Sequence, residues 1–174
     1  MSSAIIFIHG LWMNGKDMYL LRYRFKKIGY KTFQFKYNST KQTPVENAHL
    51  LSEYIDSVKH EKINFVCHSL GGIILRHYLS LYSTNNIGNI IMLGTPNKTS
   101  AVARKIINLP LGKKLLGKSV ENGLTGILPK WNNNEKLGII AGRIPFASGM
   151  FFSIIKSPND GTVSVEETRL DGAS

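Results

Sequence analysis

The stretch Ile63–Leu79, INFVCHSLGGIILRHYL, places a serine between an apolar run and a helix-like run. A serine hydroxyl becomes a useful nucleophile when it is presented free of steric cover and beside a base. A sharp turn from a strand into a helix presents it in this way, provided that the residues two before and two after the serine are small. These residues are Cys67 and Gly71, and Gly72 follows. Because cysteine is still among the smallest side chains, the pattern predicts Ser69 as a nucleophile.

The backbone near this serine could bind a developing negative charge. A helix that begins directly after Ser69 points the positive end of its dipole at the serine, and the N–H of Leu70 is a natural donor to an oxyanion. The first apolar run of the chain ends in FIHGLWMNG, with His9 and Gly10 at its carboxyl end. Ligands collect beyond the carboxyl ends of parallel strands, so we expect the N–H of Leu11 to be the second donor.

Strand-like runs alternate with helix-length segments along most of the chain. This alternation, with strands that are continuously apolar, predicts an α/β fold with a mostly parallel sheet and helices on both faces. Thr43 and Pro44 are the residue types that begin a helix, and Asn14 is expected to cap an earlier helix that stops at Gly29. The predicted strands are Ala4–Ile8, Lys31–Lys36, Ile63–Val66, Ile87–Leu93 and Leu137–Ala141.

An insertion interrupts this alternation at about residues 95–136. Its short helical patterns are broken by several glycines and prolines. An irregular segment of this length inside a compact domain is usually functional, so we expect a lid or a binding surface. The chain is long enough for one domain and contains no linker, so residues 1–174 are expected to form a single domain that carries this insertion.

At these motifs the sequence resembles the α/β-hydrolase family, in particular its small lipase-like and esterase-like members. The resemblance rests on IFIHGLW, FVCHSLGG, IIMLGTPN and SPNDGTVSV, in the family's order along nearly the whole chain. It implies Ser69 as the nucleophile and Asp160 as the acid of a catalytic triad. It also implies an oxyanion hole from the N–H groups of Leu11 and Leu70. Supporting roles in the site would fall to His9, Gly10, His68 and Gly71.

Asp160 is also a candidate on local grounds. Only Asp160 and Asp171 are aspartates that follow Ser69. A carboxylate in the turn NDG could orient a histidine and stabilise its charge. The alternative is that these residues simply form a turn, in which they are favoured.

The chain does not provide an obvious histidine base for Ser69. All five histidines precede Asp160, whereas the resemblance calls for one after the acid; they are His9, His49, His60, His68 and His77. We expect each to be structural, with His68 pointing away from Ser69 and His9 holding the oxyanion loop. The resemblance implies a triad histidine outside the 174 residues, together with a last strand and a last helix; the alternative is a naturally shortened and inactive product. Residues 1–174 alone are therefore expected to be inactive.

The charge of the chain limits its partners. The net charge is +11, and no acidic residue lies between Glu61 and Glu121, where eight lysines and arginines occur. Such a patch suits an anionic surface, although a solvated basic face without a partner is the alternative. In the insertion these cations alternate with Ile, Leu and Val, as in an interfacial segment. An anionic membrane surface is therefore the expected partner, and no nucleic acid is expected.

The remaining signals concern compartment and cofactors. The single cysteine and the absence of a basic leader before the first apolar run predict a cytoplasmic protein without disulfides. The apolar segment Leu137–Ile155 contains Arg143 and Pro145, which argue against a membrane span. No cysteine and histidine cluster has metal-ligand spacing, so no metal and no other cofactor is expected. The oligomeric state is not specified by these patterns.

Together these features predict a serine hydrolase that cleaves carboxylic esters, with lipid or other acyl esters preferred, through an acyl-enzyme on Ser69. A non-catalytic hydrolase-fold module that binds anionic lipid or a protein is the alternative. Thioester hydrolysis and acyl transfer use the same serine chemistry and form a further alternative. Six apolar residues are candidates for an acyl pocket, although core packing would explain them as well: Trp12, Met13, Phe146, Met150, Phe151 and Phe152.

Overall fold

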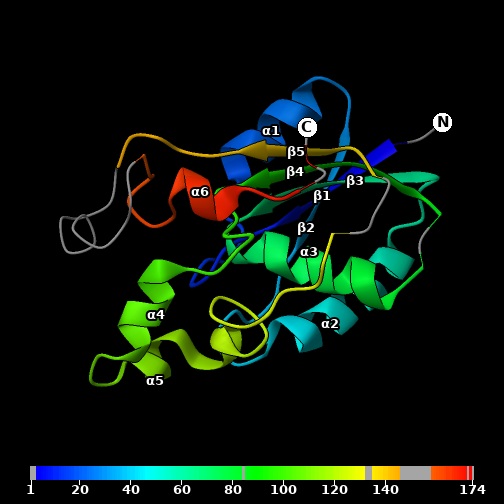
Figure 1. The fold of residues 1–174 in the computed structure, drawn as a ribbon. Coiled ribbons are helices and arrows are strands. Elements are labelled where there is room, and N and C mark those ends of the chain that lie inside the picture. The colour runs from blue at the N-terminus through cyan, green and yellow to red at the C-terminus, as the bar shows by residue number, and fades with distance from the viewer. Residues whose placement is uncertain (1–2, 84, 132–134, 146–157, 172, 174) are drawn as a thin grey trace.

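A parallel sheet of five strands forms the centre of the fold (Figure 1). The computed structural model describes residues 3–83, 85–131, 135–145, 158–171 and 173. The strand order is β2-β1-β3-β4-β5, and each neighbouring pair is parallel. The strands are β1 (Ser3–Ile8), β2 (Lys31–Phe35), β3 (Lys62–His68), β4 (Ile87–Leu93) and β5 (Leu137–Ile140). The predicted α/β class and all the predicted strands are confirmed, and their ends shift by only one or two residues.

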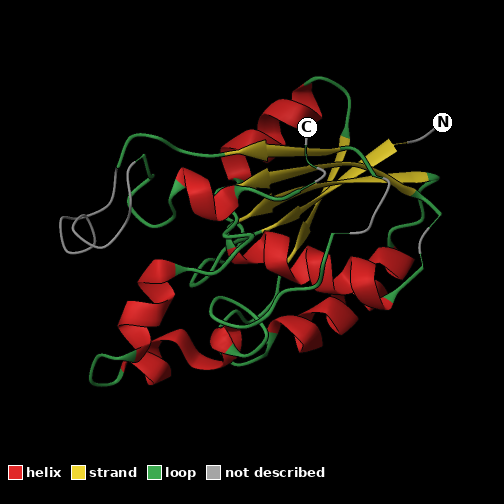
Figure 2. Ribbon diagram, in the orientation of Figure 1, coloured by secondary structure: helices red, strands yellow, loops and turns green. Residues whose placement is uncertain are grey.

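Helices cover the sheet on both faces (Figure 2). One face carries α1 (Tyr19–Lys27), and the other carries α2 (Pro44–Ser57) and α3 (Leu70–Leu81). Successive strand residues point to opposite faces, so both sets of side chains in β1 must be apolar. Ile6 and Ile8 belong to the larger core under α2 and α3, whereas Ile5 and Phe7 belong to the smaller core under α1.

The start of α2 follows the predicted capping pattern. Thr43 accepts a hydrogen bond from the backbone N–H of Glu46 at 3.1 Å, and the Glu46 carboxylate accepts one from the N–H of Thr43 at 2.6 Å. Pro44 occupies the first turn, where its missing N–H would have no helical partner. This capping box confirms the predicted helix start.

The start of α1 differs from the prediction. Asn14 does not cap this helix; its side-chain oxygen accepts a hydrogen bond from the N–H of Lys16 at 3.2 Å in a local turn. Such side-chain-to-backbone turns compete with helix formation. The helix begins only at Tyr19, after Met18, whose side chain is buried in the smaller core. It ends as predicted before Gly29, which has a φ of +96°.

The insertion packs beyond the carboxyl edge of the sheet as three short helices. They are α4 (Ala101–Ile107), α5 (Gly112–Leu116) and the 3-10 helix η1 (Gly117–Val120), and a last short helix is α6 (Val165–Thr168). The buried Arg76 of α3 anchors both ends of this region, because its guanidinium donates to the carbonyl oxygens of Asn97 and Pro129. Within the described ranges, no helix is long and apolar enough to cross a membrane.

His77 makes a second contact between α3 and the insertion and should link stability to pH. Its Nε2 lies 2.6 Å from the carbonyl oxygen of Asn122. Burial lowers the pKa of His77 below its usual 6.5, the hydrogen bond to Asn122 raises it, and the charge of Arg76 lowers it further. The unfolded state therefore binds more protons than the folded state as the pH falls below about 6.5, so the free energy of unfolding decreases there.

We expect His77→Gln, which keeps a donor for the carbonyl of Asn122, to reduce this loss between about pH 5 and pH 6.5. Some pH dependence should remain, because burial also lowers the pKa of His9. Urea unfolding at a series of pH values measures the slope. A slope equal to that of the wild type would contradict the assignment of His77 as a buried neutral group.

Candidate active site

Ser69 lies at a strained turn between β3 and α3. Its φ of 49° and ψ of −119° fall in a region that residues other than glycine rarely adopt. Holding such a conformation costs about 1–3 kcal/mol, and strained residues of this kind cluster at functional sites. The turn is fixed by the N–H of Ser69, which donates to the carbonyl of Leu93 at 2.9 Å. The predicted presentation of this serine at a sharp strand-to-helix turn is therefore present.

Two glycines allow α3 to approach the sheet. A Cβ atom at Gly71 would lie 2.5 Å from the carbonyl oxygen of Ile8, and one at Gly72 would lie 2.3 Å from the Oγ1 of Thr95. Both distances are too short for any larger residue. Cys67, the departure from a glycine at the first small position, is fully buried in the larger core, and burial raises the pKa of its thiol. It packs as a neutral apolar side chain.

The loop after β1 brings the second predicted oxyanion donor to the same edge. Within the described residues, the N–H groups of Leu11 and Leu70 donate no hydrogen bond. The next N–H, that of Trp12, donates to the hydroxyl of Ser39 at 2.9 Å, which fixes the path of the loop. These two free donors are the feature that an oxyanion hole requires.

His9 and Gly10 stabilise the start of this loop. His9 is fully buried, stacks on Tyr37 at a ring distance of 4.2 Å, and its Nδ1 lies 2.9 Å from the carbonyl oxygen of Gly10. The hydroxyl of Tyr37 donates to the carbonyl of His9 at 2.7 Å. A Cβ at Gly10 would lie 3.2 Å from the Cβ of Ser69, so a side chain there would crowd the serine.

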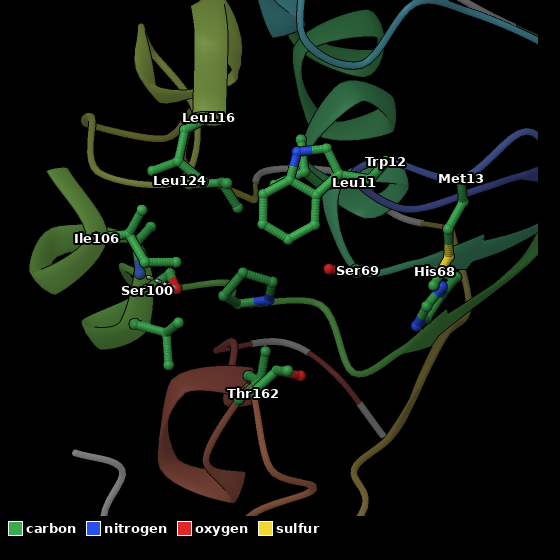
Figure 3. A pocket seen from close by; sticks show the side chains of 14 residues that line it. Leu11, Trp12, Met13, His68, Ser69, Ser100, Ile106, Leu116, Leu124 and Thr162 are labelled. Atoms are coloured by element: carbon green, nitrogen blue, oxygen red, sulfur yellow. Dashed lines mark hydrogen bonds between the residues drawn. The ribbon is translucent and has the colours of Figure 1, made fainter. Parts of the chain in front are cut away.

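A mostly apolar pocket of about 180 Å³ opens beside Ser69 (Figure 3). Trp12 and Met13 line it, as predicted for an acyl pocket. The other predicted pocket residues, Phe146, Met150, Phe151 and Phe152, lie outside the described residues. Leu11 and His68, which were expected at the site in other roles, also line it. The rest of the lining was not predicted from the sequence: Pro96, Ser100, Val102, Ala103, Ile106, Leu116, Leu124, Thr162 and Val163.

Trp12 connects the β1–α1 loop to the insertion. In the view of Figure 3 its indole ring lies between the hydroxyl of Ser69 and the insertion leucines 116 and 124. The indole N–H donates to the carbonyl oxygen of Leu115 in α5 at 3.0 Å. Trp12 has a φ of 59° and is 56% exposed. Its backbone therefore adopts an unfavourable conformation that places the aromatic ring at the rim of the pocket.

Asp160 reaches the same edge of the sheet from the loop after β5. One carboxylate oxygen closes the turn by accepting from the N–H groups of Thr162 and Val163 at 2.8 and 2.7 Å. The other oxygen faces Gly94 at the end of β4, 3.1 Å from the position that a Cβ would occupy there. Thr162 and Val163 line the pocket of Ser69. Asp160 therefore closes a local turn with one oxygen, as in the alternative interpretation, and its other oxygen stays available for the predicted role of triad acid.

His68 does not point away from Ser69 as predicted. It lines the same pocket, and its Nδ1 lies 3.6 Å from a carboxylate oxygen of Asp17. The glycine at position 10 makes room for this arrangement, because a Cβ there would be 3.0 Å from the His68 Nδ1. No hydrogen bond joins His68 to Ser69 within the described part of the chain.

The other histidines lie away from Ser69. His49 on α2 contacts the hydroxyl of Tyr82 at 2.6 Å, and His60 packs against the ring of Phe33. His77 contacts the insertion, as described above. His9, His49, His68 and His77 make no hydrogen bond to Ser69 or Asp160 in the described part of the chain.

Comparison with known proteins gives both a family and a fold. A family model described as "Putative serine esterase (DUF676)" matches residues 2–103, more than half of the chain. No curated protein matches it. The lipase BlEst2 of Bacillus licheniformis in its mature form is 20% identical, with a TM-score of 0.76 over 98% of this chain and 80% of that chain.

Two further solved structures are similar. The phospholipase PlaB of Legionella pneumophila is 18% identical, with a TM-score of 0.71 over 97% of this chain and 46% of that one. The esterase EaEST of Exiguobacterium antarcticum is 14% identical, with a TM-score of 0.66 over 100% of this chain and 82% of that one. These likenesses show that the chain has the α/β-hydrolase fold.

The contact between Gly71 and the carbonyl of Ile8 predicts a large effect of one methyl group. We expect Gly71→Ala to lower the free energy of unfolding by about 1–3 kcal/mol, because backbone must move to accommodate the Cβ. The matched control is Gly138→Ala in β5, where the nearest atom to the new Cβ would be 4.0 Å away. Denaturant unfolding compares the two variants, and equal effects would argue against the close approach.

Proposed function

Because this chain belongs to the family described as "Putative serine esterase (DUF676)", we propose that it is a serine hydrolase that cleaves carboxylic esters of acyl chains. The observation that carries this proposal is the strained Ser69 at the mouth of an apolar pocket, beside two free backbone N–H groups. A nucleophile, an oxyanion site and an apolar cavity are the three parts that acyl-ester cleavage needs in one place.

In the proposed reaction, the Ser69 hydroxyl attacks the acyl carbonyl carbon and loses its proton to a base. The N–H groups of Leu11 and Leu70 stabilise the negative oxygen of the tetrahedral intermediate. The intermediate collapses, the C–O bond to the alcohol breaks, and the alcohol leaves with the proton. Water then attacks the acyl-enzyme by the same route, which releases the carboxylic acid and restores the serine.

The base in this scheme is a histidine whose ring would lie between Ser69 and Asp160. Asp160 has the geometry to orient it: one oxygen is held in the turn, and the other makes no hydrogen bond within the described residues. His68 is less suited to the role, because its Nδ1 lies 3.6 Å from a carboxylate oxygen of Asp17 and no hydrogen bond joins it to Ser69 among the described residues. We therefore assign His68 a supporting role.

The pocket favours an acyl chain over a polar substituent. Its volume of about 180 Å³ is comparable to that of an apolar cavity of roughly 150 Å³ that holds a benzene molecule. Its lining on the insertion side is aliphatic, with Val102, Ile106, Leu116 and Leu124. A short or medium acyl chain would bury its apolar surface there, whereas a charged substituent would lose its hydration without a partner.

A fluorophosphonate probe tests the nucleophile. We expect the full-length protein to be labelled at Ser69, and we expect Ser69→Ala to abolish labelling, because the probe reacts only with an activated serine. Mass spectrometry of the modified peptide locates the label. Labelling that survives Ser69→Ala would exclude Ser69 as the nucleophile, and no labelling of the wild type would favour a non-catalytic hydrolase-fold module.

Asp160 and Asp171 form a matched pair for testing the acid. Asp160→Asn should lower kcat/KM for a soluble acyl ester by on the order of 10³–10⁴-fold, as expected for a triad acid. Asp171 follows in the same segment and is exposed, so Asp171→Asn should have little effect. Thermal unfolding of both variants checks the fold. A similar small change for both would leave Asp160 as a turn residue only.

A further inference from the structure

The outer face of the insertion carries an exposed apolar and basic surface. We call residues 109–115, which comprise the turn after α4 and most of α5, the insertion tip (Figure 1). Leu109, Leu111 and Leu115 are 58%, 77% and 55% exposed. The inward side chains of the same region, such as Ile106 and Leu116, are buried and line the pocket of Ser69. The insertion therefore has two apolar sides, and only the inner one is covered.

Leu111 is costly for the isolated chain in two ways. Its φ of 62° places it in the left-handed region, which is unfavourable for a residue that has a Cβ atom. The leucine side chain also remains in water at this position. A glycine or asparagine would satisfy the turn better. The leucine side chain is mostly exposed, so it buries little apolar surface within the folded chain. A partner that covers it would bury that surface.

The charges of the insertion tip indicate what kind of partner this is. Lys113 and Lys114 lie beside the exposed leucines, and Lys105 lies on the preceding helix. None of these three makes an ion pair with a described residue, whereas Lys98 and Lys118 pair with Glu166 and Glu46. Leucines next to unpaired lysines suit the boundary between lipid headgroups and acyl chains. Single-stranded nucleic acid would instead favour aromatic rings for stacking.

The insertion tip is continuous with the rim of the pocket. Leu115 on its outer side precedes Leu116, which lines the pocket. The half-exposed Trp12 also lines the pocket, and its indole donates to the carbonyl of Leu115. A flat surface placed against the leucines would therefore lie close to the entrance that leads to Ser69.

We propose that the insertion tip docks on an anionic lipid bilayer. Leu109, Leu111 and Leu115 enter the interface, and Lys113 and Lys114 contact anionic headgroups. Docking holds the pocket rim at the membrane. The supply of a lipid ester to Ser69 rests on the function proposed above, whereas the binding itself does not.

Vesicle sedimentation of the full-length protein tests this surface. Binding to phosphatidylcholine vesicles that contain phosphatidylglycerol should exceed binding to pure phosphatidylcholine and should weaken with added salt. Lys113→Gln with Lys114→Gln should weaken binding roughly 30-fold, since each lysine near such a surface contributes about 5-fold. Leu111→Gly should weaken binding while leaving the thermal midpoint equal or higher, because it relieves the left-handed conformation.

The α1 face provides matched controls. It also carries exposed apolar residues and lysines, so Lys26→Gln with Lys27→Gln and Ile28→Gly repeat the changes of charge and apolar area. These variants should bind like the wild type. Binding lost in the α1 variants, binding equal in all variants, or equal binding to neutral vesicles would each overturn the proposal. Preferential binding to a DNA duplex over anionic vesicles would overturn it as well.

An activity measurement separates this proposal from the proposed function. The insertion-tip variants should turn over a soluble short-chain ester at the wild-type rate, because the altered side chains do not line the pocket. If vesicle binding depends on the insertion tip but no ester is cleaved, the docking surface stands and the hydrolase assignment fails. If the ester is cleaved but vesicle binding does not depend on the insertion tip, the hydrolase assignment stands and the docking surface fails.

Discussion

The close approach of α3 to the end of β1 is the constraint on which the site depends. The backbone of Gly71 lies so near the carbonyl of Ile8 that no side chain fits between them. This contact lies two residues after the strained turn at Ser69 and holds the start of α3, with Leu70, against the sheet. The nucleophile and Leu70 therefore depend on this packing contact, whereas the loop that carries Leu11 is fixed by the hydrogen bond from the N–H of Trp12 to Ser39. The cost of the close approach is a strained serine, which the surrounding parallel sheet holds in place.

The sequence predicted the parts of the fold that depend on local patterns. Continuous apolar runs identified the strands, because both faces of this sheet are buried, and Thr43 with Pro44 identified the start of α2. Asn14 was misassigned because its side chain can cap a helix or close a local turn, and only the burial of Met18 decides between the two. The family resemblance and the turn residues both indicate Asp160 as the candidate acid, and its carboxylate lies near Gly94 at the end of β4.

The composition of the pocket could not be predicted in the same way. Its lining comes from the β1–α1 loop, the insertion and the turn at Thr162, which are distant in sequence and meet only after folding. His68 was misplaced because the expected direction of its side chain came from the strand alone, whereas the space for its ring depends on Gly10 of another strand end. Residues in such a pocket do not recur at a regular spacing in the sequence, because each one packs against neighbours from other elements.

The anchor of the insertion has a consequence for how that region can move. Among the described residues, Arg76 is buried without a carboxylate partner. It holds the insertion through the carbonyl oxygens of Asn97 and Pro129 and the side-chain oxygen of Asn97. Burial lowers its pKa to about 10, so it remains charged at neutral pH. A buried cation regains hydration when it is exposed. If the insertion were to separate from α3, water would replace each carbonyl and the guanidinium would recover its solvation. The hydrogen bonds of Arg76 therefore specify where the insertion sits against α3 while adding little to the free energy needed to displace it, so that displacement is opposed mainly by other contacts, such as those of His77 with Asn122 and of Trp12 with Leu115.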